Sequence, residues 1–187
     1  MINSFYSEKE LCELGFHSIG KNVRISKKAS FYGEKNISIG NNVRIDDFCL
    51  LSGKLCLGNN IHISAGVYMY GGEAGIVVKD FSTISSRTVI YAVNDDYSGE
   101  FMACSAVDEK YRNVTKKEVI IEKHVAIGTG CTILPGLTLG EGSAIGAMSL
   151  VKNDTKPWFI YAGIPCRQKK ERSRRILEIE KEMFEEL

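Results

Sequence analysis

Aliphatic side chains recur at every sixth position along two stretches of the chain. The first run is Ile39, Ile45, Leu51, Leu57, Ile63 and Met69, and the second is Ile121, Ile127, Ile133, Leu139, Ile145 and Val151. A helix repeats near 3.6 residues and a strand near 2, so this period indicates neither a helix nor a simple hairpin. It predicts short strands joined by turns, in which each strand directs one side chain into a common interior.

The residues between the aliphatic positions supply turn chemistry. Glycine often follows the aliphatic residue, and asparagine pairs stand at 41–42 and 59–60. The chain contains 18 glycines and only three prolines, without low-complexity tracts. This composition is typical of many tight turns in a regular array.

Three segments break the period. Residues 1–18 precede it and contain the pattern of a short capped helix. Residues 94–117 form a polar excursion, and a loop of this length inside a regular solenoid is usually functional. Near the end, apolar residues among charged ones predict an amphipathic helix over 168–187. We therefore expect a single domain, residues 1–187, whose solenoid covers 19–167.

Composition excludes several classes of protein. The net charge is +1, so no overall field recruits nucleic acid or an anionic membrane. No apolar run approaches the roughly 20 residues of a membrane-spanning helix, and the first residues lack a secretory signal pattern. The six cysteines form no C-x-x-C pair, and several fall on the apolar repeat. We predict reduced, buried cysteines and a cytoplasmic location.

The strongest motif lies near the C-terminus. Residues 133–142 read ILPGLTLGEG, residues 145–151 read IGAMSLV, and residues 161–167 read YAGIPCR. Together they resemble the closing coils of the hexapeptide-repeat acyltransferases, which include galactoside and maltose, chloramphenicol and streptogramin, and surface-polysaccharide acetyltransferases. The resemblance covers nearly the whole chain. It implies an all-β, left-handed parallel β-helix with an extended loop and a C-terminal helix; the period alone does not set the hand.

The resemblance also implies acetyl-CoA as co-substrate. A thin pantetheine arm can lie between coils where glycine and alanine allow close approach, and its phosphates require cations. A cluster of basic residues at the end of the solenoid could supply them, or could be only a solvated helix face: Lys152, Arg167, Lys169, Lys170 and Arg172. The resemblance places Trp158 or Phe159 near the adenine. The implied contacts are Gly128, Gly146, Ala147, Lys152, Gly163, Pro165, Arg167 and Lys170.

The expected general base is missing. In the galactoside and maltose enzymes a loop histidine takes the proton of the acceptor hydroxyl, and the matching position here is Asn94 or Asp95. Of the three histidines, His17 and His62 suggest ordinary surface or turn roles. His124 directly follows the loop and could reach the same cleft across a subunit boundary.

A carboxylate is the alternative base, with Asp95 first, then Asp96, then Glu73. An ordinary aspartate has a pKa near about 3.9, so burial or a neighbouring carboxylate would have to raise it. The acidic pair could instead be a turn or metal-linked element. An amine acceptor needs no protein base once it is deprotonated.

The main functional expectation is O-acetyl transfer to a sugar, in surface-polysaccharide or nucleotide-sugar metabolism. The alternative is N-acetyl transfer to an amino sugar, which the absent loop histidine favours, and antibiotic acetylation ranks third. A non-catalytic scaffold is the alternative outside the enzymes. A zinc site like that of γ-class carbonic anhydrases needs three convergent histidines, and His17, His62 and His124 are too far apart in coil number. We therefore expect no metal.

We expect a homotrimer, because the related enzymes are trimers with sites between neighbouring solenoids. Exposed apolar side chains on flat faces would also need covering. The residues concerned are Tyr68, Tyr70, Tyr91, Phe101 and Met102.

Overall fold

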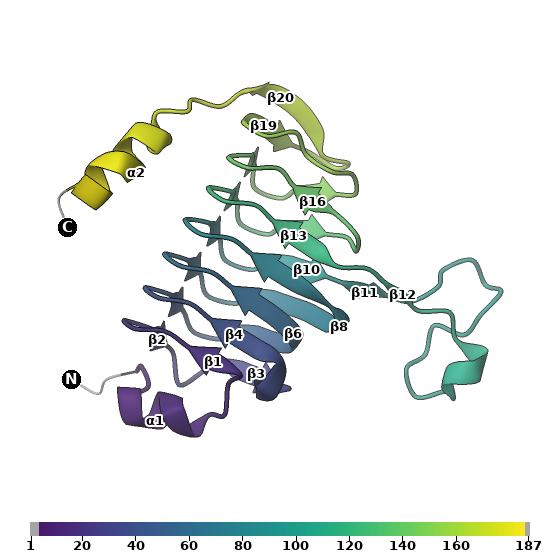
Figure 1. Ribbon diagram of the computed structural model, residues 1–187. Helices are drawn as coiled ribbons and strands as arrows, with labels where there is room; N and C mark the ends of the chain where they lie inside the picture. The colour runs from purple at the N-terminus through teal and green to yellow at the C-terminus, as the bar shows by residue number, and fades with distance from the viewer. Residues whose placement is uncertain (1–3, 186–187) are drawn as a thin grey trace.

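The computed structural model describes residues 4–185 and shows a triangular β-solenoid (Figure 1). Its strands form a ten-stranded sheet and an eight-stranded sheet, which we call the first and second sheets. Two long strands, β6 (Leu50–Leu57) and β8 (Tyr68–Val78), bend across one edge of the triangle, so the first sheet covers two faces. The second sheet covers the third face. The predicted left-handed β-helix is confirmed.

The remaining strands are short. The first sheet also contains β1 (Ser18–Ile19), β3 (Ser30–Tyr32), β4 (Ile37–Ile39), β10 (Val89–Tyr91), β13 (Val119–Ile121), β15 (Thr132–Ile133), β16 (Thr138–Leu139) and β18 (Leu150–Val151). The second sheet contains β2 (Arg24–Ile25), β5 (Arg44–Ile45), β7 (His62–Ile63), β9 (Thr83–Ile84), β14 (Ala126–Ile127), β17 (Ala144–Ile145), β19 (Phe159–Ala162) and β20 (Arg167–Glu171). We name each coil after its strand in the second sheet.

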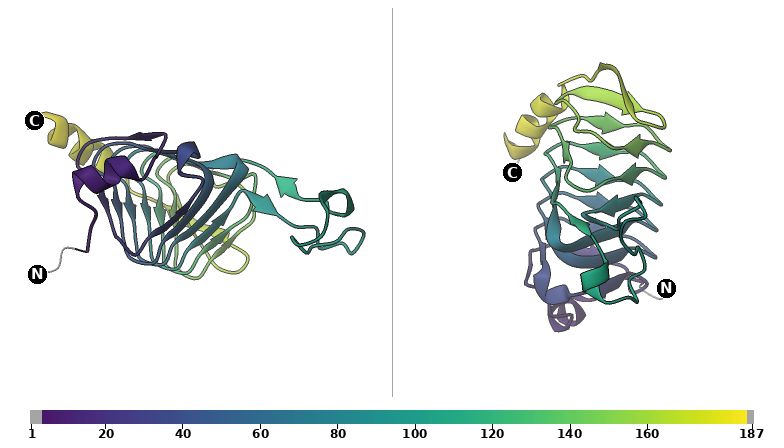
Figure 2. Two further views of the ribbon diagram at one scale, coloured as in Figure 1. Left: turned by 90° about the horizontal axis from the view of Figure 1, so that it is seen from below. Right: turned by 90° about the vertical axis from the view of Figure 1, so that its right-hand side faces the viewer.

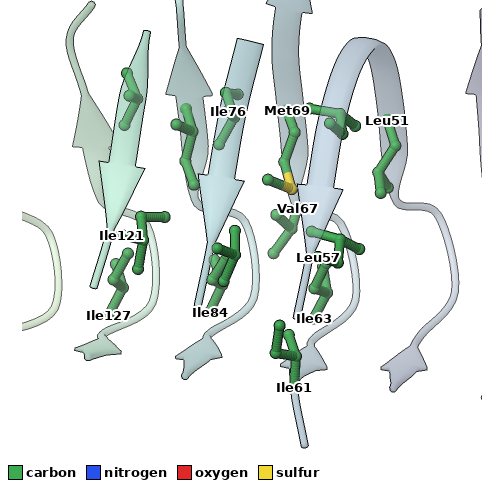
Figure 3. Close-up of a cluster of buried hydrophobic side chains, with 14 of the residues drawn as sticks. Leu51, Leu57, Ile61, Ile63, Val67, Met69, Ile76, Ile84, Ile121 and Ile127 are labelled. Atoms are coloured by element: carbon green, nitrogen blue, oxygen red, sulfur yellow. The ribbon is translucent and has the colours of Figure 1, made fainter. Parts of the chain in front are cut away.

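The six-residue period is the period of the core. In the second sheet Ile63 pairs with Ile84, and Ile84 pairs with Ile127 one coil further. These side chains point inward, stacked from coil to coil (Figure 3). All twelve aliphatic residues of the two predicted runs are at most 3% exposed. Each such burial stabilises the fold by about 1.5–3 kcal/mol, which explains why the period persists along the whole solenoid.

Three edges join the faces, and we name them by what lies on them. The helix-covered corner carries Asn22, Asn42, Asn60, Phe81, His124, Gly142 and Trp158, all with positive φ. The open corner carries Phe48, Gly66, Arg87, Gly130 and Met148, also with positive φ. The loop corner includes the bends of β6 and β8 and the root of the excursion. At each corner, backbone bonds between equivalent turns keep the coils in register: the N–H of Gly66 donates to Asp47 and that of Arg87 donates to Ala65.

The excursion leaves the solenoid at the loop corner (Figure 1). Strands β11 (Val93–Asn94) and β12 (Thr115–Lys116) pair antiparallel at its base, and a 3-10 turn, η2 (Glu109–Tyr111), lies further out. A second 3-10 turn, η1 (Glu34–Asn36), joins β3 to β4. The predicted extended loop is confirmed.

Two helices lie on the side away from the loop (Figure 2). Helix α1 (Glu8–Glu13) begins with a capping box between Ser7 and Glu10. Helix α2 (Ile176–Glu185) confirms the predicted C-terminal helix, but it begins later than position 168. Residues 168–171 are wrong as a helix: they belong to β20 (Arg167–Glu171), antiparallel to β19. The apolar residues that give the helix a packing face begin only at Ile176, whereas β20 gains backbone bonds at the sheet edge.

Two findings concern whole-chain properties. Within residues 4–185, no helix has the length and apolar character needed to cross a membrane. All six cysteines are free thiols; Cys49 and Cys131 are buried as predicted, whereas Cys12, Cys56 and Cys104 are exposed. The cytoplasmic location stays a prediction.

Candidate active site

The return segment of the loop holds the three candidate carboxylates in place. Arg112 Nη2 lies 3.1 Å from Asp95 Oδ1, and Lys116 Nζ lies 2.9 Å from Glu73 Oε2. Asn113 Nδ2 donates to Asp96 Oδ2 at 3.1 Å. The loop therefore folds back on its own root, and each carboxylate receives one partner from the returning chain.

Only one of these three carboxylates faces a groove. Asp95 and Asn94 line an open groove of about 730 Å³ at the loop corner, beside the stacked rings of Tyr70 and Tyr91, whose centroids are 5.2 Å apart. Asp96 and Glu73 do not line it. The hydrogen bond from Lys116 lowers the pKa of Glu73, and hydrogen bonds from Ser98 lower the pKa of Asp96. A lowered pKa makes a carboxylate a weaker base, so the structure favours Asp95.

Arg112 is a functional candidate that the sequence reasoning missed. Its side chain is 16% exposed, and its Nε is a buried donor without a hydrogen-bond partner within residues 4–185. The guanidinium occupies Oδ1 of Asp95, and Oδ2 has no hydrogen-bond partner among residues 4–185. Arg112 is the only arginine between positions 94 and 117, a signal that could have drawn attention to it.

His124 does not lie near Asp95 in one chain. It sits on the helix-covered corner, 5% exposed, with Nε2 2.8 Å from Glu180 Oε2 of α2. Its ring stacks on Phe81, with centroids 5.4 Å apart, and lies 6.2 Å from Trp158. For an acceptor to reach His124, α2 would have to move. A catalytic role for this histidine stays a prediction.

The predicted coenzyme A contacts follow the open corner. Gly128, Gly146, Ala147 and Gly163 occupy successive turns there, in the β14, β17 and β19 coils. The structure shows a second reason why position 128 must be glycine. A Cβ on Gly128 would lie 2.6 Å from the backbone nitrogen of Ala147. Glycine is needed here for coils to stack as well as for a ligand to approach.

The open corner also offers hydrogen-bond donors. Among the described residues, the backbone N–H groups of Thr129 and Ala147 have no acceptor. Water satisfies such exposed groups in the free protein, and the amide carbonyls of a pantetheine arm can replace it. This arrangement fits a long, thin, acceptor-rich ligand.

Some of the expected phosphate ligands are available and one is less so. Lys152, Arg167 and Lys170 are exposed and form no ion pair within residues 4–185. Arg172 is less available as a phosphate ligand, because its Nη1 donates to the carbonyls of His124 at 2.8 Å and Gly142 at 3.0 Å. Pro165 follows a cis peptide bond at the start of the turn into β20.

The structure buries Trp158, and its role as an adenine contact stays a prediction. It is 8% exposed and packs on the helix-covered corner, where a Cβ on Gly142 would lie 2.5 Å from its ring. Phe159, by contrast, is half-buried at the start of β19.

Ser85 is a second residue that the sequence reasoning missed. It directly follows β9 at the open corner, and its N–H donates to Ile127 O at 2.9 Å. Because Ile84 pairs with Ile127, Ser85 lies one coil below Gly128. Its backbone is therefore adjacent to the expected path of the arm. No sequence signal distinguishes it from other turn serines.

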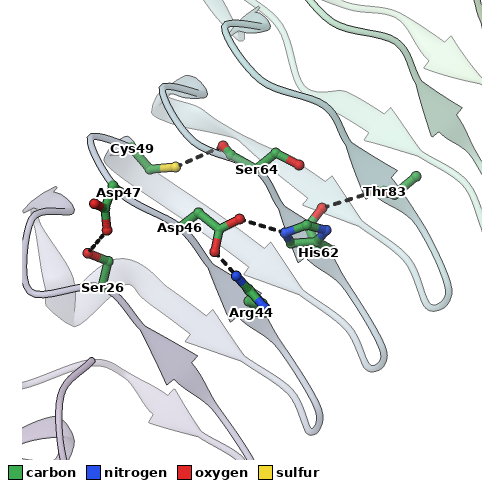
Figure 4. Close-up of polar contacts among 8 residues, drawn as sticks. All are labelled: Ser26, Arg44, Asp46, Asp47, Cys49, His62, Ser64 and Thr83. Atoms are coloured by element: carbon green, nitrogen blue, oxygen red, sulfur yellow. Dashed lines mark hydrogen bonds and ion pairs between the residues drawn. The ribbon is translucent and has the colours of Figure 1, made fainter. Parts of the chain in front are cut away.

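His62 is engaged in a surface network on the second sheet (Figure 4). Asp46 Oδ2 lies 2.8 Å from His62 Nε2, and Asp46 Oδ1 accepts from Arg44 Nε at 2.7 Å. Burial raises the pKa of Asp46, but these two hydrogen bonds outweigh it and the net pKa is lowered. In the described part of the chain, no group of three or more histidine, cysteine or acidic residues is placed to hold a metal ion.

Comparisons with known proteins identify the class. No model of a protein family matches the chain. The dTDP-4-amino-4,6-dideoxy-D-glucose acyltransferase of Escherichia coli is 46% identical over 180 residues, covering 95% of this chain and 93% of its own. The galactoside O-acetyltransferase of Escherichia coli strain K12 is 29% identical over 143 residues, covering 76% of this chain and 68% of its own.

A solved structure agrees over the full length. A serine variant of AntD, an N-acyltransferase from Bacillus cereus, in complex with dTDP-4-amino-4,6-dideoxyglucose and coenzyme A, has a TM-score of 0.98 and 51% identity, and the match covers 100% of both chains. The architecture is that of the left-handed β-helix acyltransferases. The chain belongs to the hexapeptide-repeat acyltransferase family, and it is an acyltransferase that uses acyl-CoA as co-substrate.

Proposed function

We propose that the protein transfers an acyl group from acyl-CoA to the amino group of a nucleotide-linked amino sugar. The observation that carries this proposal is Asp95, which faces the groove with Oδ1 held by Arg112 and with Oδ2 unpaired among the described residues. An ammonium group loses its proton far more readily than a hydroxyl, so a carboxylate suffices where O-transfer needs a histidine. The sequence put O-transfer first; the site and the relatives favour N-transfer.

The relatives support the choice of acceptor. The Escherichia coli enzyme is named for a dTDP-linked 4-amino sugar, and AntD was crystallised with that class of sugar and with dTDP. AntD has also been studied as variants of one serine and one aspartate that lie ten residues apart. Ser85 and Asp95 have the same spacing in this chain.

The two halves of the proposed site lie on different edges of one molecule. Ser85 and Gly128 are on the open corner, whereas Asp95 and Arg112 are on the loop corner. A second chain packed beside the first brings its loop corner to the open corner of its neighbour, and three such contacts close a ring. Exposed apolar side chains on the loop support this burial: Tyr97, Phe101, Met102 and Tyr111. We therefore propose a homotrimer with shared sites.

The chemistry follows from this placement. Acyl-CoA supplies the thioester carbonyl. We assign its binding to Gly128, Gly146, Ala147, Lys152, Gly163, Pro165, Arg167 and Lys170. Asp95 Oδ2 accepts a proton from the ammonium group of the sugar, and the free amine then forms a C–N bond as the C–S bond breaks. The thiolate that leaves takes up the second proton of the nitrogen, so the products are the amide and the free thiol of coenzyme A. Asn94 lines the same groove and can orient the sugar.

The test is thiol release from acyl-CoA with matched acceptors. We expect turnover with dTDP-4-amino-4,6-dideoxyglucose and none with its 4-hydroxy counterpart or with free galactosides. Acetyl-CoA and 3-hydroxybutyryl-CoA, the thioester bound in one AntD structure, should be compared as donors. Turnover only with hydroxyl acceptors would contradict N-transfer.

A further inference from the structure

The groove at the loop corner includes aliphatic side chains that the proposed reaction does not use. Asn94, Asp95 and Arg112 supply its polar groups, and four aliphatic residues line it as well. All four are half-buried, so each exposes apolar surface that a bound ligand can cover. We call them the apolar wall: Val93, Val114, Leu134 and Leu150.

Leu150 projects from the solenoid rather than into it. Its neighbour in β18, Val151, is 1% exposed and points into the core, and successive side chains of a strand point to opposite sides. Leu134 packs partly against the core, whereas Leu150 lies outside the core cluster. The groove therefore presents a leucine that the core does not use.

The apolar surface is wider than one methyl group. Leu150 pairs with Thr132 across β18 and β15, and Leu134 lies two residues beyond Thr132. With strands about 4.8 Å apart and a rise of about 3.3 Å per residue, the Cα atoms of the two leucines are about 8 Å apart. Carbon atoms in contact are about 4 Å apart, so an acetyl methyl group covers only part of this surface. A four-carbon acyl chain covers more of it.

A hydroxyl group stands next to Leu150. Thr132 lines the groove, and its neighbour Ile133 is buried in the core, so the Thr132 side chain points outward beside Leu150. Within residues 4–185 this hydroxyl has no hydrogen-bond partner, whereas the backbone N–H of Thr132 donates to Ser149. Water can satisfy the hydroxyl in the free protein, and a hydroxyl group on an acyl chain can replace that water.

The position of the proposed base brings the acyl chain to this wall. The amine attacks from beside Asp95, so the thioester carbonyl carbon must come within bonding distance of a nitrogen in the same groove. The carbons beyond the carbonyl then extend along the lining of the groove. Sugar hydroxyls need hydrogen-bond partners, which Asn94 and Arg112 can supply and aliphatic side chains cannot. The apolar wall is thus left for the donor.

We propose that Leu150 and Thr132 select the acyl donor, and that the chain transfers a four-carbon 3-hydroxyacyl group in preference to acetyl. Leu150 covers the added carbons, and the Thr132 hydroxyl binds the 3-hydroxyl group. This inference rests on the proposed function, because it takes Asp95 to mark the place of amine attack.

The test compares kcat/KM for acetyl-CoA, butyryl-CoA and 3-hydroxybutyryl-CoA, with dTDP-4-amino-4,6-dideoxyglucose as the acceptor. In the wild type, butyryl-CoA exceeds acetyl-CoA by about tenfold, because two further methylene groups are buried. 3-Hydroxybutyryl-CoA exceeds butyryl-CoA by about fivefold through one hydrogen bond. Leu150→Ala removes most of the preference for butyryl-CoA over acetyl-CoA, and Thr132→Val removes the preference for the 3-hydroxyl group. Ratios within one variant cancel any general loss of folded enzyme.

Leu50→Ala is the matched control. Leu50 is a half-buried leucine on the same face of the solenoid, outside the core cluster, and it does not line the groove. This variant keeps both ratios at their wild-type values. A change in either ratio here would show that the effects of Leu150→Ala do not come from the groove, and would contradict the proposal.

The contrary results separate the donor proposal from the reaction itself. A wild type that uses acetyl-CoA at least as well as butyryl-CoA would overturn donor selection and leave N-transfer intact. An unchanged butyryl-to-acetyl ratio in Leu150→Ala would also overturn it, because equal losses with all donors assign the leucine to the acceptor sugar. An unchanged preference for the 3-hydroxyl group in Thr132→Val would overturn the role of the threonine. A wild type that acylates the amino sugar with none of the three thioesters would remove the proposed function.

Discussion

The helix-covered corner and the open corner use the same backbone turn for opposite purposes. Both place a residue with positive φ in successive coils, and both hold their turns together by N–H to carbonyl bonds between coils. On the helix-covered corner, Phe81, His124 and Trp158 pack together and α2 covers them. On the open corner, small residues leave the backbone exposed and Phe48 and Arg87 point into solvent.

The two corners also differ in the hydrogen bonds of their backbone N–H groups. At the helix-covered corner, the N–H groups of Lys21, Asn41 and Asn59 donate to side-chain oxygens of the next coil, the last of them to Asp80. On the open corner the equivalent donors of Thr129 and Ala147 have no partner in the described chain. One corner therefore satisfies its backbone internally and stabilises the solenoid, whereas the other keeps donors available for a ligand.

The largest effect is expected at the loop corner. Asp95→Asn removes the proposed base and should lower kcat by about 10²–10⁴-fold without changing coenzyme A affinity. Asp96→Asn is the matched control, because Asp96 does not line the groove and should retain wild-type turnover. Thiol release measures both. If Asp95→Asn and His124→Ala both stay within about threefold of wild type, neither residue is the base.

The two corner glycines provide the next test. In Gly142→Ala the new Cβ would lie 2.5 Å from the Trp158 ring at φ +64°, so we expect a loss of about 2–5 kcal/mol in the free energy of unfolding. Gly66→Ala has φ +71° but no contact closer than 3.6 Å, and should lose only about 1–2 kcal/mol. Urea unfolding measures both, and equal losses would contradict the difference between a filled and an open corner.

A smaller effect is expected for the partner of Asp95. Arg112→Lys keeps the charge but loses the planar contact, and should lower kcat by about tenfold while KM for acyl-CoA stays unchanged. Wild-type kcat in Arg112→Lys would mean that Arg112 only supports the loop.

The smallest effect concerns α2. Burial raises the pKa of Glu180, but hydrogen bonds from Lys123 and His124 outweigh it and lower the pKa below its ordinary value of 4.5. The ionised Glu180 carboxylate therefore stabilises the folded state fully above pH 4.5, and this stabilisation is lost as the pH falls through the lowered pKa. We expect the free energy of unfolding to fall by about 1 kcal/mol over this pH range. The fluorescence of Trp158, the only tryptophan, reports the unfolding. Glu180→Gln should remove the pH dependence in this window; if it persists, another group controls helix docking.

The fold could be predicted because the residues that recur with its period are the ones buried in its core, such as Ile63, Ile84 and Ile127. The start of α2 was missed because β20 gains its stability from β19, a partner the local pattern does not contain. The hand came only from the family resemblance.

The site was predicted only in part. Asp95 and the small residues near Ala147 follow from the loop position and the closing motif. Ser85 and Arg112 did not, because their roles depend on which coil lies above Ser85 and on how the loop folds back. Nor did the sequence show the burial of Trp158, which depends on its contact with Gly142 one coil away.

Subunit mixing tests the central claim, that the open corner of one chain works with the loop corner of another, most directly. Asp95→Asn disables the proposed base on the loop corner, and Ala147→Trp fills the proposed path of the pantetheine arm at an exposed position of the open corner. Each variant alone should be inactive, but trimers reassembled from an equal mixture should recover about a quarter of wild-type thiol release, because mixed rings contain one intact pair. Mixed trimers that form and remain inactive would show that each site is built within one chain.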